Sequence, residues 1–189
     1  MCADTYIYPP LLLNQLNAIM NILLRVKAYQ LFLIYVFSVI FSTDGIAGRI
    51  IFCLSVCINI VWIYSIGLSM NKLIPEKFRP KIAYFKASCL LILVWITVAL
   101  TIFGGYSINQ DNYAEYGNWL WVLIPAHLYL MWSFFYMFYF ASKMLNSVID
   151  GEIVGFSTYY RTFFAMWIFP IGVWFIQPAV QRILASKSE

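Results

Sequence analysis

The chain has 189 residues, of which 63% are hydrophobic and 11% are charged, with a net charge of +4 and a mean hydropathy of +0.80. A soluble domain is usually about 45–50% apolar and about 25% charged, so this composition excludes an ordinary water-soluble globular protein. It also excludes a disordered chain, a collagen-like chain and a disulfide scaffold. The composition predicts a polytopic integral membrane protein.

The N-terminal region lacks the pattern of a secretory signal, which is a basic stretch followed by a short apolar core and a small-residue cleavage site. Tyr8 and two prolines then predict an extended or turn element. Residues 11–24 mix apolar side chains with four amides, which are Asn14, Gln15, Asn17 and Asn21. This pattern predicts an amphipathic helix that lies on the membrane or continues into the first span.

Charged residues divide the rest of the chain into five uncharged apolar runs, at 28–41, 50–70, 87–106, 119–140 and 163–180. A helix needs about 20 residues to cross a bilayer core about 30 Å thick. The second, third and fourth runs have 21, 20 and 22 residues and are long enough. The fifth run has 18 residues. The first has 14 and reaches the needed length only if it begins at Leu23, with the long side chains of Arg25 and Lys27 extending to the membrane interface. The prediction is one all-α transmembrane domain over 1–189, a bundle of four to five spans near 23–41, 50–70, 87–106, 119–140 and 163–180.

The distribution of Lys and Arg predicts the orientation. Five crossings place nine cations with the N-terminus and three on the opposite side, and the positive-inside rule assigns the nine to the cytoplasm. The N-terminus is then cytoplasmic and the C-terminus lies outside. Arg182 and Lys187 oppose this assignment, and a re-entrant fifth segment would return them to the cytoplasm and change the ratio to 11:1. A full fifth span is the first reading, and the re-entrant segment stays open as the alternative.

Three polar residues fall at similar depths of the predicted spans. Asn59, Thr97 and His127, the only histidine, each lie nine or ten residues from the outer end of a run, or about 13–15 Å below the outer boundary. Polar groups at such depth normally face other helices and hydrogen-bond there. They predict an intramembrane polar layer that sets helix register. The functional alternative is a proton relay, a gate or a ligand contact, with His127 as the candidate because its charge changes near neutral pH.

A basic loop at residues 71–86 separates the second and third spans. We expect it to set the topology by lying on anionic headgroups, and the alternative is a docking surface for an acidic or phosphorylated partner. Its cations are Lys72, Lys77, Arg79, Lys81 and Lys86. Elsewhere, Cys53 and Cys57 have no nearby histidine or acid in the same predicted helix to complete a metal site, and no catalytic constellation is present. We therefore expect no catalytic residues, no metal, no cofactor and no nucleic-acid partner.

The last apolar run contains the segment FPIGVWFIQP at residues 169–178. Together with residues 151–164, it resembles the C-terminal signature of small, uncharacterised multi-span bacterial membrane proteins. The resemblance implies a bacterial inner-membrane setting and a structured last segment. Physically, Pro170 and Pro178 with Gly172 between them predict a broken helix, and Gln177 would make a contact near the outer surface. The alternative is a kink that neighbouring helices fill.

Four or five helices leave little room for an aqueous path within one copy, and the spans show no inverted repeat. We therefore predict a non-enzymatic membrane protein in the lipid bilayer that forms a homo-oligomer or joins a membrane or cytoplasmic partner protein. Its action would be permeation or membrane perturbation, as in a small channel or a membrane effector. One alternative is a binding or sensing module that holds an apolar ligand or lipid at the aromatic fourth span. Another is an intramembrane enzyme, for which catalytic groups are missing.

Overall fold

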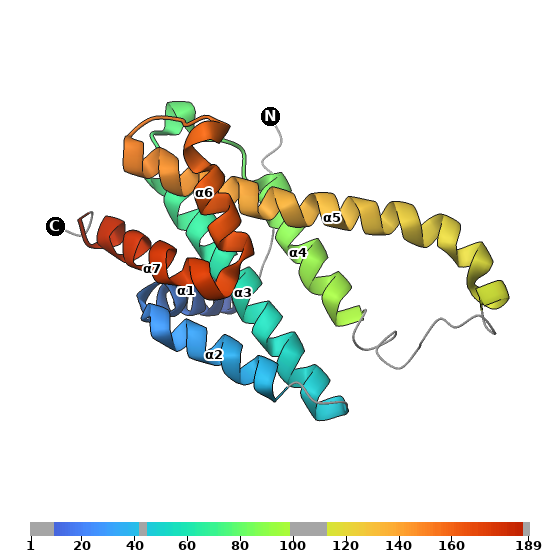
Figure 1. The fold of residues 1–189 in the computed structure, drawn as a ribbon. Helices are drawn as coiled ribbons and strands as arrows, with labels where there is room; N and C mark the ends of the chain where they lie inside the picture. Colours follow the sequence, from blue (N-terminus) through green and yellow to red (C-terminus); the bar gives the residue numbers. More distant parts are fainter. Residues whose placement is uncertain (1–9, 42–44, 99–112, 187–189) are drawn as a thin grey trace.

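The computed structural model describes residues 10–41, 45–98 and 113–186, and these residues form an all-α structure without strands. Seven α-helices and one short 3-10 helix follow one another along the described chain (Figure 1). Their bounds are α1 Pro10–Arg25, α2 Ala28–Ile40, α3 Ile46–Leu73, η1 Glu76–Phe78, α4 Ala83–Val98, α5 Tyr113–Asp150, α6 Phe156–Trp167 and α7 Phe169–Ser186. The predicted all-α class is therefore confirmed.

Helix α3 lies at the centre of the bundle and contacts α1, α2, α4 and α5. It has 28 residues and a mean hydropathy of 2.2 in its most apolar window. At about 1.5 Å per residue it is about 42 Å long, which exceeds the bilayer core. Among the described helices, α3 is the one that is both long and apolar enough to cross a membrane. It contains the whole of the predicted second span.

The chain turns sharply between α1 and α2. The axis of residues 18–25 and that of α2 differ by 101°, so residues 23–41 do not form one straight helix. If the bent pair were one span, it would be a second membrane-crossing candidate by length and composition. Hereafter the turn at residues 23–27 is called the α1–α2 corner.

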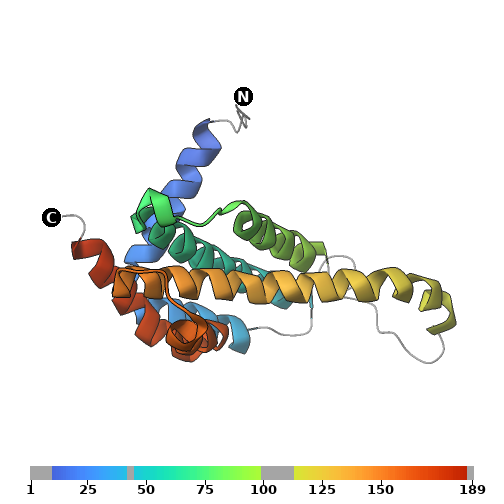
Figure 2. The ribbon, with the colours of Figure 1, turned by 90° about the horizontal axis from the view of Figure 1, so that it is seen from above.

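Helix α5 has 38 residues and a length of about 57 Å, nearly twice the bilayer core. Its C-terminal half packs against α3, α4 and α6. Its N-terminal half extends beyond the other described helices in both views (Figures 1 and 2). Pro125 lies inside this extended half. The helix ends at Asp150, where Gly151 adopts a φ of 75°, the left-handed conformation that commonly terminates helices.

The last predicted span, residues 163–180, is divided between α6 and α7, which pack against each other as a helical hairpin. The break lies at Ile168, whose carbonyl accepts from the N–H of Gly172 at 2.9 Å and so begins α7. Pro170 lies in the first turn of α7, where its missing N–H costs no helical hydrogen bond. Pro178 lies inside α7. The chain therefore breaks ahead of both prolines and not between them.

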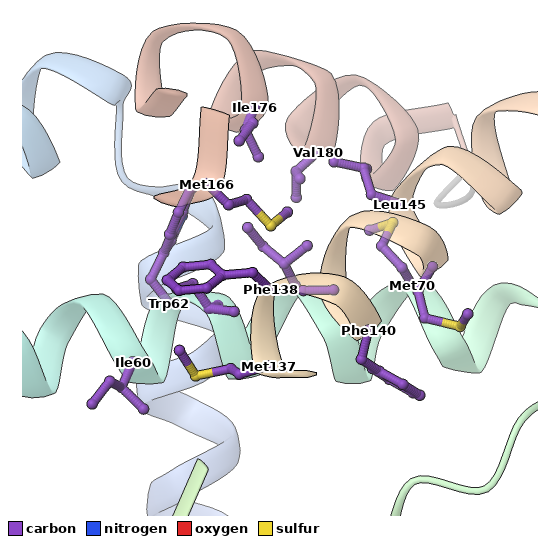
Figure 3. Packing of buried hydrophobic residues seen from close by; sticks show 14 of the residues in the cluster. Ile60, Trp62, Met70, Met137, Phe138, Phe140, Leu145, Met166, Ile176 and Val180 are labelled. Carbon is purple, nitrogen blue, oxygen red and sulfur yellow. The ribbon is translucent and has the colours of Figure 1, made fainter. Parts of the chain in front are cut away.

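The hydrophobic core fills the space between α3, the C-terminal half of α5, and the α6–α7 hairpin (Figure 3). Trp62, Met137 and Met166 come from three of these helices, and each is fully buried. Ile176 and Val180 of α7 face the same cluster in the close view. The core thus holds the hairpin against the central helix.

Candidate functional site

The α1–α2 corner exposes backbone carbonyls that need hydrogen-bond donors. Helix α1 ends at Arg25, and the last four carbonyls of a helix have no partner within the helix. In apolar surroundings each unpaired polar group raises the free energy by several kcal/mol on transfer scales. The carbonyl of Ile22 accepts from the N–H of Val26 at 3.0 Å, which leaves the carbonyls of Leu23, Leu24 and Arg25 at the helix end, and that of Val26 in the turn, for other donors.

Gln177 of α7 supplies most of these donors. Its side chain is fully buried, and its Nε2 lies 3.0 Å from the carbonyl oxygen of Leu23, 3.0 Å from that of Leu24 and 2.6 Å from that of Val26. Its Oε1 accepts from the indole Nε1 of Trp62 at 2.7 Å. One amide therefore connects α7, the α1–α2 corner and the central helix α3.

Gln181 lies one turn further along α7 and repeats the contact. Its Nε2 lies 3.1 Å from the carbonyl oxygen of Arg25 and 2.9 Å from that of Val26, with a longer contact of 3.4 Å to Leu24. Residues four apart share one helix face, so both glutamines reach the same turn. We call Gln177 and Gln181 the glutamine pair. It acts as a C-cap for α1 that is supplied from the opposite end of the sequence.

Aromatic rings complete the surroundings of the glutamine pair. The ring of Trp62 meets that of Phe169 edge to face, with centroids 5.2 Å apart and planes at 80°. The ring centroid of Tyr35 in α2 lies 5.6 Å from that of Phe169. Such pairs add about 0.5–1.5 kcal/mol beyond the burial of their area. They fix the indole so that its N–H points at Gln177.

The α6–α7 hairpin is closed by a contact that only glycine allows. A Cβ atom placed on Gly172 would lie 1.7 Å from the carbonyl oxygen of Ala165 in α6 and 2.4 Å from its carbonyl carbon. Because these are backbone atoms, they cannot move aside without shifting a helix. Gly172 therefore sets the close approach of α7 to α6 that brings Gln177 to the corner.

The predicted polar layer is not a single buried cluster within one chain. Asn59 is half-buried in α3, whereas Thr97 is exposed and its hydroxyl donates to the Leu93 carbonyl of its own helix at 2.8 Å. His127 is exposed on the extended half of α5. The similar depths predicted from sequence thus correspond to different environments.

The predicted broken-helix residues have separate roles. Pro170 begins α7, Gly172 contacts α6, and Pro178 lies exposed within α7. Gln177 is fully buried against the α1–α2 corner. The reason is that the hairpin turns its glutamine face toward the core and toward the carbonyls of α1.

In the basic loop, Arg79 differs from its neighbours. Its Nη2 donates to the carbonyl oxygens of Lys72 and Ile74 at 3.0 and 3.1 Å, and its Nε lies 3.3 Å from that of Ile74. It therefore caps the C-terminal end of α3, where a cation also complements the helix dipole. The remaining cations of the loop are exposed, namely Lys72, Lys77, Lys81 and Lys86.

A groove of about 550 Å³ lies beside the glutamine pair, between α1, α3 and α7. Its polar lining residues are Asn21, Arg25, Lys27, Ser69 and Gln181. Leu24 and Leu184 supply apolar walls. A second cavity of about 540 Å³ lies where the turn after α3 meets the end of α5, with Pro75, Phe78 and Glu152 among its lining residues.

Sequence reasoning missed Trp62 and Gln181. Two signals were available: a tryptophan deep within an apolar run needs an acceptor for its N–H, and two glutamines four residues apart mark one polar stripe on an apolar helix. Neither signal identifies the partner, since the corner lies more than 150 residues away from Gln177 in sequence.

No family model, curated protein or solved structure matches this chain. The resemblance of residues 151–178 to small bacterial membrane proteins therefore stays a prediction.

Proposed function

We propose that this chain is a non-enzymatic, multi-pass membrane protein that assembles with further copies of itself and acts on membrane permeability. The observation that supports a membrane location is the number of exposed apolar side chains. Among the described residues, 35 large apolar or aromatic side chains are exposed. Soluble monomers rarely expose continuous apolar patches above a few hundred Å², so lipid is the fitting environment. The resemblance noted above supports a bacterial inner membrane.

The proposed topology has four crossing segments, α2 to α5, and a re-entrant α6–α7 hairpin. Helix α6 ends at Trp167, and α7 turns back to pack against it, so in this topology the two helices enter and leave the membrane on one face. Helix α7 also packs against α2 and α1, and its Leu184 lines the same groove as Ser69 near the C-terminal end of α3. This arrangement supports a cytoplasmic C-terminus and an 11:1 distribution of cations. It favours the alternative that the sequence left open.

Self-assembly is supported by the extended half of α5. Of its eleven described side chains at residues 121, 122 and 124–132, nine are exposed, including His127. An imidazole at membrane depth is costly against lipid and normally faces protein or a water-filled path. A second copy that covers this face would enclose His127. The paired imidazoles could then line a path for protons or small ions.

The topology is tested with reporter fusions in bacteria. A fluorescent protein fused after Glu189 is expected to fluoresce, because it folds in the cytoplasm. A periplasmic phosphatase fused within residues 107–118 is expected to be active. Phosphatase activity at the C-terminal fusion, with no fluorescence there, would overturn the hairpin topology.

The assembly is tested by native mass spectrometry in nanodiscs and by proton flux in liposomes. The unaltered chain is expected to form oligomers and to raise flux above that of empty vesicles. His127→Ala should lower both, while Ser157→Ala, which changes an exposed polar residue on α6, should change neither. A strictly monomeric particle without flux would contradict the proposal.

A further inference from the structure

We propose that the groove beside the glutamine pair binds the phosphate headgroup of an anionic phospholipid. Its volume of about 550 Å³ accommodates a phosphate with part of its glycerol unit. Two of its lining residues, Arg25 and Lys27, are cations, and no acidic residue lines it among the described part of the chain. Asn21 and Ser69 add neutral polar side chains to the lining.

The local electrostatics suit an anion for a second reason. A helix C-terminus normally carries a partial negative charge on its unpaired carbonyls, which would repel phosphate. Here the amides of Gln177 and Gln181 donate to these carbonyls at the α1–α2 corner. These donors partly compensate the negative end of α1, and the only formal charges that line the groove among the described residues are those of Arg25 and Lys27.

The geometry favours a lipid over a soluble phosphate compound. Residues 18–25 of α1 lie at 101° to α2, so in the proposed topology, where α2 enters the membrane, this end of α1 runs along the membrane surface. Ile19 and Ile22 of α1 are exposed, and Leu24 and Leu184 line the groove, so acyl chains can contact apolar side chains while the headgroup meets the cations. Basic pockets between helices on the cytoplasmic side are typical binding sites for anionic headgroups.

This inference rests on the membrane placement proposed above and not on self-assembly or flux. The test keeps the full chain in nanodiscs made from a three-to-one mixture of zwitterionic and anionic phospholipids. Native mass spectrometry after progressive delipidation then identifies the lipids that remain bound. A chain that stays monodisperse in buffer without detergent or lipid would refute the membrane placement itself.

The unaltered chain is expected to retain anionic lipid. The double substitution Arg25→Gln with Lys27→Gln should reduce that retention by about thirtyfold, which corresponds to about 2 kcal/mol for two cations. The control is Arg49→Gln with Arg161→Gln, which removes equal charge from exposed positions outside both the groove and the basic loop and should leave retention unchanged. Equal losses in both double variants would overturn the groove as the site.

A further variant changes the shape of the groove without changing its charge. Leu184→Trp fills the groove and keeps both cations, so it should also reduce anionic lipid retention if the groove is the site. Adding inorganic phosphate to the nanodiscs distinguishes the two sources of the ligand. Lipid retention that persists in excess phosphate supports the lipid, whereas displacement by inorganic phosphate points to a soluble phosphate compound and overturns the lipid assignment. Circular dichroism of each variant checks that it remains folded.

Discussion

The two halves of α5 belong to one aromatic-rich helix but have different environments. In the half at residues 133–148, nine side chains are buried and one, Phe135, is exposed. In the half at residues 121–132, nine of the eleven described side chains are exposed. The first half is covered by α3, α4 and α6, whereas the second extends beyond the bundle (Figure 2).

This contrast separates helix formation from packing. A helix satisfies its backbone hydrogen bonds internally, so it can persist in lipid without neighbours. The packed half therefore should contribute to the stability of a single chain, and the extended half to what the chain binds. Four substitutions test this division.

Gln177→Leu should have the largest effect, because this one side chain joins α7 to both α1 and α3 by hydrogen bonds. The substitution leaves the Trp62 N–H and the Leu23 carbonyl without their present partner. At about 1–3 kcal/mol for each such buried group, we expect a loss of about 4 kcal/mol in the free energy of unfolding. Unfolding in mixed detergent micelles measures it. Adding Trp62→Phe should recover part of the loss, and strict additivity of the two changes would contradict the hydrogen bond.

Met137→Ala tests the packed half of α5 directly. The Met137 side chain is fully buried in the core, so its truncation removes apolar contacts and leaves a cavity. Such changes cost about 2–5 kcal/mol in other cores. The same detergent unfolding assay applies, and an effect below about 0.5 kcal/mol would show that this half is not the stabilising one.

Gly172→Ala tests the closure of the hairpin. The new methyl group overlaps the Ala165 carbonyl, and over-packing of this kind costs about 1–3 kcal/mol. Gly155→Ala is the matched control, because a Cβ atom there meets nothing within 4 Å. We expect a lower melting temperature for the first variant and little change for the second. Equal melting temperatures would mean that α6 and α7 are not held this closely.

Leu128→Ala should have the smallest effect on the isolated chain. Leu128 is 61% exposed on the extended half of α5, and exposed substitutions usually change stability by less than about 0.5 kcal/mol. In nanodiscs, however, the proposed contact between copies predicts a lower oligomer fraction. If Leu128→Ala lowered the free energy of unfolding of the monomer in micelles by more than about 1.5 kcal/mol, the two halves would not differ in their contribution to stability.

Local sequence patterns were sufficient to predict the helices but not the contacts between them. Residues 50–70 lie within α3 because a long uncharged run favours a helix wherever it folds. Residues 119–140 lie within α5 for the same reason, yet the run does not reveal that its two ends differ in burial. Gln177 was identified as notable from its position between prolines, but its contacts depend on segments that the pattern does not connect.

By itself, the sequence determined the all-α class and the central helix, since backbone hydrogen bonding and apolar length are local properties. Only the tertiary structure decided that residues 163–180 break at Ile168 and fold into a hairpin. It also decided that Gln177 meets Trp62, which is 115 residues away. The physical reason is that a buried amide takes whichever donors and acceptors the packed helices bring to it, and a one-dimensional pattern of charge and hydropathy does not specify that packing.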